Sequence, residues 1–382
     1  MIAKRDIVFF ALLFFSQIWT IKIGPLSVAM LFFAACALFY PKFNKIPLAA
    51  YLLGTAAVSS IIFWWVPAYD STLHYSRLMP IISVFFVFLF LSLIKLFDSY
   101  KLSSAARNYA LTCLLFSLLS AAIFTTQNFI SAEDGPVGFF NEKGLYGYYL
   151  VLLGLILITQ RPGLFSISIL FLITNYVFFV VEASRALLLY IAFAFIYLQA
   201  GNIKTKIWLL FFALLLAMAV IFSNFGEMLA LKLSILGSGE GTIGRYAAMT
   251  LVANSTLSEF VFGHGFGTYL NYRAMHLELP GDATYDYAGS LILELIFEVG
   301  LPATLMLLVI LTKYVFGRFS VFLFCAFICL VAIGGKHDIQ MLTSIIFMKI
   351  IYENLTTKKL NLSLRNKSQN RGHSLNAKSI AC

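Results

Sequence analysis

Residues 144–159 read GLYGYYLVLLGLILIT, a stretch without a charged side chain. Similar stretches recur along nearly the whole chain of 382 residues, of which 61% are hydrophobic and 12% charged. A soluble globular domain has too little interior to bury that much apolar surface. Apolar runs of this kind cross a bilayer as helices. The sequence therefore predicts an all-α polytopic membrane protein.

The apolar stretches predict about 12 transmembrane helices, separated mostly by short connections. We expect them at 7–21, 26–40, 46–66, 79–96, 109–125, 144–159, 164–181, 185–200, 207–222, 288–310, 318–333 and 339–355. This divides the chain into helices 1–9 (1–222), a large loop with short helices (223–287), helices 10–12 (288–355) and a basic tail (356–382). No small-residue cleavage site follows the first stretch, so we expect it to remain as an anchor.

The distribution of Lys and Arg sets the expected orientation. With both termini in the cytoplasm, 18 of the 27 basic residues fall on the inner side, eight on the outer side and Lys349 within the last helix. Positive charge accumulates on the cytoplasmic side of membrane proteins. We therefore expect a multi-pass protein of the bacterial inner membrane, with its long loop on the periplasmic side. We interpret the basic tail as an inner-side determinant rather than a nucleic-acid site, because no basic module accompanies it.

The cysteines indicate packing rather than a disulfide framework, because none lies in an outer loop. Cys325 and Cys329 share a helix face, but no His or carboxylate beside them completes a metal site. The five positions are Cys36, Cys113, Cys325, Cys329 and Cys382.

The loop over residues 223–287 is too long to be a passive connection, and functional residues concentrate in such loops. Within it, residues 259–270 read EFVFGHGFGTYL, with Gly263, Gly265 and Gly267 at every second position. Glycine lets a backbone approach another backbone or a ligand closely. We interpret the stretch as the floor of an active-site loop, with His264 as a candidate contact. We expect its aromatic residues to anchor it at the membrane interface; these are Phe262, Phe266 and Tyr269.

A second glycine-rich run in the same loop, LGSGEGTIGR, ends at Arg245 and leads into a short amphipathic helix. Its match to GxGxxG does not indicate a dinucleotide site, because no strand or βαβ unit surrounds it. Backbone N–H groups at a helix start, with an arginine in the first turn, suit an anionic oxygen cluster. The alternative is a surface arginine after a loop.

Arg185 and Glu182 lie between two apolar stretches, in VVEASRALLLY at 180–190. Ionisable groups at the membrane usually have a partner or a task. One interpretation is a mutual ion pair that closes a tight outer turn. The other is that Arg185 faces a lipid-linked phosphate at the outer surface.

Acidic and amide side chains gather at the outer ends of two further helices. Asn141, Glu142 and Lys143 lie at the mouth of the helix at 144–159, which we expect to pack closely against its neighbours. Asp282 and Asp286 precede the helix at 288–310, and Glu294 and Glu298 within it share a face, where they need a polar cavity or a partner rather than lipid.

Five of these features, in this order, resemble the O-antigen ligase/polymerase superfamily of lipopolysaccharide and capsule assembly. They are Asn141, Ser184–Arg185, Gly244–Arg245, FGHGFGTY at 262–269 and ELIFEVGL at 294–301. The resemblance covers residues 138–310; upstream, only the hydropathy matches. It implies a GT-C-like glycosyltransferase architecture, metal-independent and without a cofactor.

The resemblance also implies a reaction and its partners. The donor would be an oligosaccharide on undecaprenyl diphosphate at the periplasmic face, held by Arg185 and Arg245. A flippase, a chain-length regulator and membrane lipids are the expected partners. Ligases carry a histidine where this chain has Gly289 or Ser290, so the resemblance favours a polymerase. The expected general base is then Asp286, with His264 second.

We therefore expect two sets of site residues, one catalytic and one substrate-binding. The catalytic set is Asp286, His264 and Arg245, and the substrate-binding set is Arg185, Arg245, Asn141, Glu142 and Tyr287. Two alternatives remain open: an O-antigen ligase that transfers finished polymer to lipid A–core, and a transporter or flippase. A transporter is disfavoured because such folds usually contain two related halves, and the first half has no counterpart of the 223–287 loop.

Overall fold

The computed structural model is almost entirely helical in the residues that it describes, which confirms the predicted all-α class. Within them, a two-residue antiparallel pair, β1 (Lys22–Ile23) and β2 (Leu26–Ser27), joins the first two helices. The structure describes residues 4–18, 21–23, 26–39, 89–126, 138–140, 143–160, 163–183, 185–201, 203–221, 248–266, 268–269, 290–332, 334 and 340–357.

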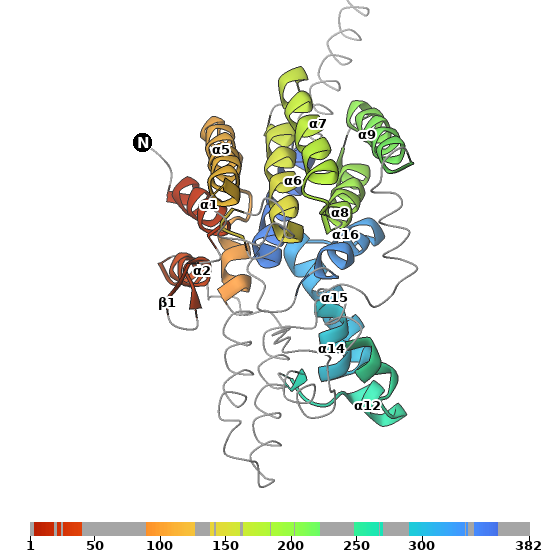
Figure 1. Cartoon of the computed structure of the whole chain (residues 1–382). Helices are drawn as coiled ribbons and strands as arrows, with labels where there is room; N and C mark the ends of the chain where they lie inside the picture. Colours follow the sequence, from red (N-terminus) through yellow and green to blue (C-terminus); the bar gives the residue numbers. More distant parts are fainter. Residues whose placement is uncertain are drawn as a thin grey trace, which may run out of the picture.

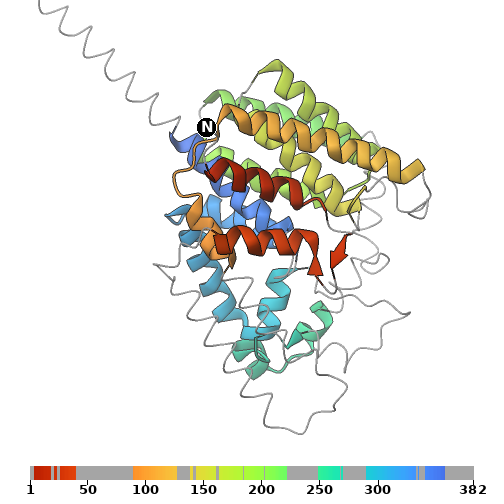
Figure 2. The same ribbon diagram turned by 90° about the vertical axis from the view of Figure 1, so that its left-hand side faces the viewer.

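Most of the described helices follow the predicted apolar stretches along the chain (Figures 1 and 2), and the predicted helix at 46–66 lies outside the described residues. They are α1 (Lys4–Phe15), α2 (Val28–Phe39), α5 (Ser104–Thr126), α6 (Lys143–Gln160), α7 (Leu164–Phe179), α8 (Arg185–Ala200), α9 (Ile203–Ile221), α12 (Leu257–Phe262), α14 (Leu291–Val299), α15 (Leu301–Phe316) and α16 (Val321–Val331). Helical residues also cover 89–96, 248–253 and 340–357.

Helix α6 lies between α5 on one side and α7 and α8 on the other (Figure 1). Most of its side chains are buried, as expected for a helix that is apolar on all sides. Two glycines let its neighbours come close. A Cβ added at Gly147 would overlap the Cβ of Ala183, and one added at Gly154 would lie 2.6 Å from Leu170 Cδ1. Small residues permit such close helix contacts, and the predicted tight packing of this helix is confirmed.

The C-terminal end of α6 lies beside both ends of the described chain. Gln160 Nε2 donates a hydrogen bond to the carbonyl oxygen of Ser103 (2.8 Å). In the segment before α5, the carbonyl oxygen of Asp98 accepts a hydrogen bond from Arg5 Nη1 (3.2 Å). The backbone N–H of Leu102 in the same segment donates one to Asn354 Oδ1 (3.1 Å). The first residue of α6 lies at the opposite end of its 18 residues. At about 1.5 Å per residue these span roughly 27 Å, close to the hydrocarbon thickness of a bilayer.

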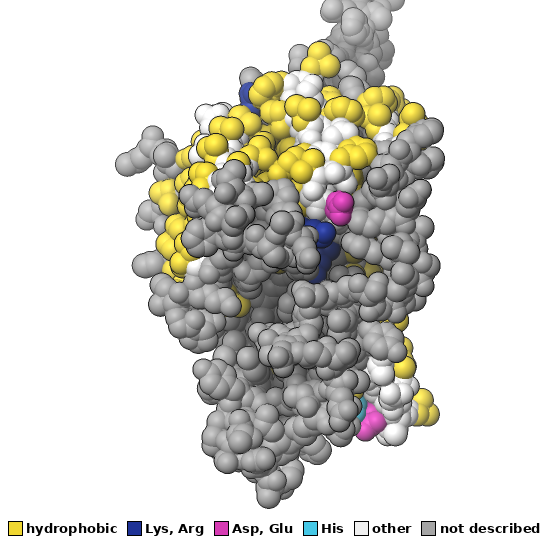
Figure 3. Space-filling model, viewed as in Figure 1, with side chains coloured by type: hydrophobic (Ala, Val, Ile, Leu, Met, Phe, Trp, Pro, Cys, Tyr) yellow, Lys and Arg dark blue, Asp and Glu magenta, His cyan; other side chains and the backbone are white. Residues whose placement is uncertain are grey.

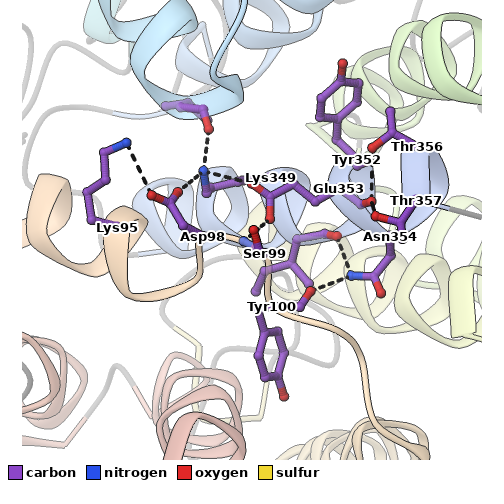
Figure 4. A network of polar contacts seen from close by, with 12 residues as sticks. Lys95, Asp98, Ser99, Tyr100, Lys349, Tyr352, Glu353, Asn354, Thr356 and Thr357 are labelled. Atoms are coloured by element: carbon purple, nitrogen blue, oxygen red, sulfur yellow. Dashed lines mark hydrogen bonds and ion pairs between the residues drawn. The ribbon is translucent and has the colours of Figure 1, made fainter. Parts of the chain in front are cut away.

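A polar network at that end fixes the helix at 340–357 (Figure 4). Lys349 is buried, and its Nζ contacts Asp98 Oδ1 (2.6 Å), Glu353 Oε1 (3.1 Å) and the carbonyl oxygen of Val315 (2.8 Å). Lys95 pairs with the other oxygen of Asp98 at 3.4 Å. An ammonium group has three N–H donors, so these three partners account for all of them. The network is therefore a structural junction between three segments.

Two of the described helices, α5 and α6, are long and apolar enough to cross a membrane. Helices α15 and α16 meet the same criterion together, but their axes are bent by 108° at the break between them, so the pair would form a third span or a re-entrant segment. Helices α7 and α8 are apolar but shorter. The number of about 12 spans therefore stays a prediction.

The predicted helix at 288–310 is wrong as a single element. Helix α14 ends at Val299 and α15 begins at Leu301, with Gly300 between them at a φ of +83°. A positive φ is incompatible with a continuous right-handed helix. A Cβ at Gly300 would overlap the backbone of Val261, so the large loop crosses α14 and α15 at the break. Hydrophobicity alone does not reveal this crossing.

Candidate functional site

Arg185 is the first residue of α8, and its side chain is buried, with 6% exposed. The side chain lies against the first turn of α6. A Cβ added at Gly144 would lie 3.1 Å from Arg185 Cδ and 3.5 Å from its Nε. The missing side chain of Gly144 therefore provides the space that Arg185 occupies, and the two helix starts meet at this point.

The neighbouring ion pair joins the same two helix starts. Lys143 Nζ lies 3.6 Å from Glu182 Oε2, and both side chains are partly exposed. Glu182 belongs to the turn between α7 and α8 and has a φ of +54°, an unusual value for a residue other than glycine. In the face drawn in Figure 3, basic and acidic side chains adjoin near the middle, below a mostly hydrophobic surface. The Glu182 carboxylate therefore pairs with the lysine of α6.

These residues form a cluster, Lys143–Gly144–Glu182–Arg185, with a clear electrostatic character. It carries two cations and one carboxylate. The N-terminal ends of α6 and α8 add partial positive charge, because the first N–H groups of a helix have no partner within it. Such an arrangement suits an anionic group with several oxygen atoms.

A second cluster surrounds the glycine-paced stretch and caps α14. The backbone N–H groups of His264 and Gly265 donate to the carbonyl oxygens of Phe297 (2.9 Å) and Glu298 (2.8 Å). The last carbonyls of a helix otherwise have no backbone partner within it. Gly263 has a φ of +74°, and an added Cβ there would overlap the backbone of Glu298. The predicted close approach of this stretch to another backbone is therefore confirmed at Gly263.

The imidazole of His264 is held by its neighbours. Its ring stacks on Phe297 with centroids 4.1 Å apart and an interplanar angle of 18°. Nε2 lies 3.4 Å from Ser255 Oγ, and Nδ1 lies 3.9 Å from Glu259 Oε1. Hydrogen bonds from Thr256, chiefly from its backbone N–H, lower the pKa of Glu259. These contacts explain the position of His264 by packing and local hydrogen bonds.

The expectation that the aromatic residues of this stretch lie at a membrane interface is wrong for Phe266 and Tyr269. Both side chains are fully buried. Tyr269 packs on Phe297, and its backbone N–H donates to Glu298 Oε1 at 3.3 Å. The loop folds back over α14, so its aromatic rings enter the core. Phe262 alone of the three is exposed.

The two carboxylates of α14 are also buried, as their position required. Glu294 and Glu298 are 2% and 1% exposed, and Glu298 accepts the Tyr269 N–H described above. Near them, an open apolar groove of about 500 Å³ contains none of the predicted site residues; it is lined by Met249, Val252, Ala253, Ser255, Leu257, Phe260 and Leu293.

The structure thus places two of the predicted site residues in different clusters among the described residues: Arg185 starts α8 and lies against α6, and His264 follows α12 and packs against α14. The other predicted site residues lie outside the described residues; they are Asn141, Glu142, Arg245, Asp286 and Tyr287. Lys143 is part of the Arg185 cluster and was absent from the predicted set. The sequence placed it at the mouth of the helix at 144–159, beside Asn141 and Glu142, but gave it no role in the site.

Metal-ligating side chains do not assemble in the described ranges, where no group of three or more His, Cys, Asp and Glu residues is placed to hold a metal ion. Comparisons of the chain with protein-family models, with curated proteins and with solved structures found no match.

Proposed function

We propose that this chain is a membrane-embedded polymerase of a surface polysaccharide. It would join repeat units carried on undecaprenyl diphosphate by glycosyl transfer at the outer face of the bacterial inner membrane. The observation that carries the proposal is the buried guanidinium of Arg185 between the N-terminal ends of α6 and α8. A diphosphate is an anion of the kind that such a site suits.

The position of the cluster supports the proposed topology. It lies at the opposite end of α6 from Arg5, from the Lys349 network and from the end of the helix at 340–357. If both chain ends are in the cytoplasm, as we propose, the cluster is at the periplasmic face, where a lipid-linked donor would present its diphosphate. The six basic residues of the tail follow the helix at 340–357 on the cytoplasmic side.

The reaction explains why cations are needed here. The hydroxyl of an acceptor sugar attacks the anomeric carbon of the donor, the bond to the diphosphate breaks, and negative charge grows on the leaving group. A preorganised guanidinium stabilises that charge more in the transition state than in the ground state. The base that accepts the hydroxyl proton is Asp286 or His264 in this proposal.

Complementation of a deletion strain tests the proposal. Lipopolysaccharide is separated on gels after expression of wild type, Arg185→Ala, Arg185→Lys or the matched control Arg107→Ala, which replaces an arginine stacked on Phe165 of α7. We expect wild type and the control to convert a single-repeat band into a ladder, Arg185→Ala to leave the single band, and Arg185→Lys to restore little. A lysine cannot reproduce the fork of a guanidinium.

The same gels separate the alternatives. Polymer that accumulates on the lipid carrier, with unsubstituted core, would identify a ligase. Repeat units trapped on the cytoplasmic side of the membrane would identify a transporter. A normal ladder from Arg185→Ala, at wild-type expression, would overturn the proposed role of the arginine.

A further inference from the structure

The Lys143–Glu182 pair lies at the proposed anion site but has no task in the reaction described above. Three facts define it. The two charges are 3.6 Å apart, and their side chains are 37% and 50% exposed. Lys143 is followed directly by Gly144, against which the side chain of Arg185 lies. Lys143 is therefore the residue directly before the glycine that Arg185 packs against.

The Lys143–Glu182 ion pair can break at little cost in free energy, so that Lys143 can bind another anion. An ion pair of this exposure contributes little to stability, because water screens both charges and the two long side chains lose freedom when they meet. Lys349 provides the contrast within the same chain: it is buried, with all three donors satisfied. A lysine held by one exposed carboxylate can turn to an incoming anion, whereas Lys349 cannot.

Glu182 is held in position by the turn, not by the lysine alone. The turn between α7 and α8 is closed by backbone hydrogen bonds from Val181 to Tyr176 (3.0 Å) and from Ala183 to Val177 (3.2 Å). Glu182 adopts its positive φ between these two bonds. The backbone of Glu182 therefore keeps its position beside the cluster whether or not Lys143 contacts the carboxylate.

We propose that Glu182 is an intramolecular placeholder for the anionic substrate, and that Lys143 is a further cation of the diphosphate site. This inference rests on the proposed function. When the diphosphate binds, Lys143 moves from the carboxylate to the phosphate oxygens and Arg185 remains in place. The carboxylate competes with the phosphate oxygens for Lys143, and so weakens retention of the lipid diphosphate that leaves after each transfer. Without that competing carboxylate, Lys143 would hold the product more tightly.

The test measures binding of farnesyl diphosphate, a short water-soluble polyprenyl diphosphate, to the full-length protein in detergent. The variants are Glu182→Gln, Lys143→Gln, the double variant and Arg185→Ala, with Glu182→Asp and Lys143→Arg as matched controls that keep the charge. Aspartate tolerates a positive φ. Size-exclusion profiles and thermal midpoints establish that each variant is folded.

We expect Glu182→Gln to bind about two- to fivefold more tightly than wild type, as for loss of an exposed charge partner. Lys143→Gln should bind more weakly by a similar factor. The double variant should bind like Lys143→Gln, because the carboxylate acts through the lysine. Both charge-preserving controls should stay close to wild type.

Two kinds of failure are distinguishable. If wild type binds the probe and Arg185→Ala does not, but Glu182→Gln binds no more tightly than wild type, the placeholder role is overturned and the proposed function stands. If wild type does not bind the probe, or Arg185→Ala binds it equally well, both are overturned.

Discussion

The crossing of the glycine-paced stretch over α14 predicts a large cost for one added methyl group. In Gly263→Ala, the new Cβ would overlap the carbonyl group of Glu298 and the backbone nitrogen of Val299. These are backbone atoms, so no rotamer change relieves the contact. The residue also has a φ of +74° and a ψ of 177°, a region open almost exclusively to glycine.

The magnitude follows from two contributions. A non-glycine residue in this region costs about 1–3 kcal/mol. Relief of the overlap moves the loop away from α14 and breaks the hydrogen bonds from the N–H groups of His264 and Gly265, at about 0.5–1.5 kcal/mol each. The sum is a loss of about 2–6 kcal/mol in the free energy of unfolding.

Two other glycines provide matched controls. Gly317 has a φ of +72° but nothing within 4 Å of an added Cβ, so Gly317→Ala isolates the backbone conformation, at about 1–2 kcal/mol. Gly163 has neither a positive φ nor a close neighbour, so Gly163→Ala should change stability by less than about 0.5 kcal/mol.

The assay is unfolding of the purified protein in detergent, together with hydrogen exchange of the loop amides. Gly263→Ala should lower the unfolding midpoint most, and it alone should accelerate exchange at residues 264 and 265. If Gly263→Ala is no less stable than Gly317→Ala and exchange is unchanged, the crossing does not exist as described.

Three substitutions and one pH profile test other parts of the structure. Lys349→Met leaves Glu353 without this cation and Asp98 with Lys95 alone, and should lower stability by about 2 kcal/mol, less than for a fully buried pair because its partners are partly exposed; an unchanged unfolding midpoint would contradict the structural role of the network. Gly144→Ala should displace Arg185 and shorten the polysaccharide ladder at normal expression; a full ladder would contradict the packing. Because the pKa of Glu259 is lowered on folding, its stabilisation of α12 is present above the unfolded value near 4.5 and is lost as pH falls through the folded value; exchange of the α12 amides should accelerate over that range in wild type, and a Glu259→Gln variant should show no such step. Thr343→Val should be neutral or stabilising, because the buried Thr343 hydroxyl has no hydrogen-bond partner in the described part of the chain; a loss of more than about 1 kcal/mol would indicate that the hydroxyl is bonded.

The sequence predicted the helices better than the contacts between them. The stretch at 144–159 became α6 and the stretch at 185–200 became α8, within a residue of the expected bounds. The sequence also predicted that Glu294 and Glu298 share a helix face away from lipid, and both side chains are buried in the structure. The break at Gly300 was missed because the apolar run continues through it, and only the crossing of the loop explains why the helix stops there.

For the candidate site, the sequence singled out Arg185 but not the residues that surround it. The partner of Glu182 proved to be Lys143, which is 39 positions away, not a neighbour in the turn. Aromatic residues such as Phe266 and Tyr269 are typical of an anchor at the membrane interface, but the fold of the loop buries both side chains.

The sequence by itself determined the helical class. A long apolar stretch can satisfy its backbone hydrogen bonds within itself only as a helix, and whether a stretch is long and apolar depends on local composition alone. The tertiary structure decided which charged groups meet. Lys349 joins a carboxylate 251 positions away, and the starts of α6 and α8 meet at Gly144. Such contacts depend on how helices pack, and the order of residues along one helix does not contain that information.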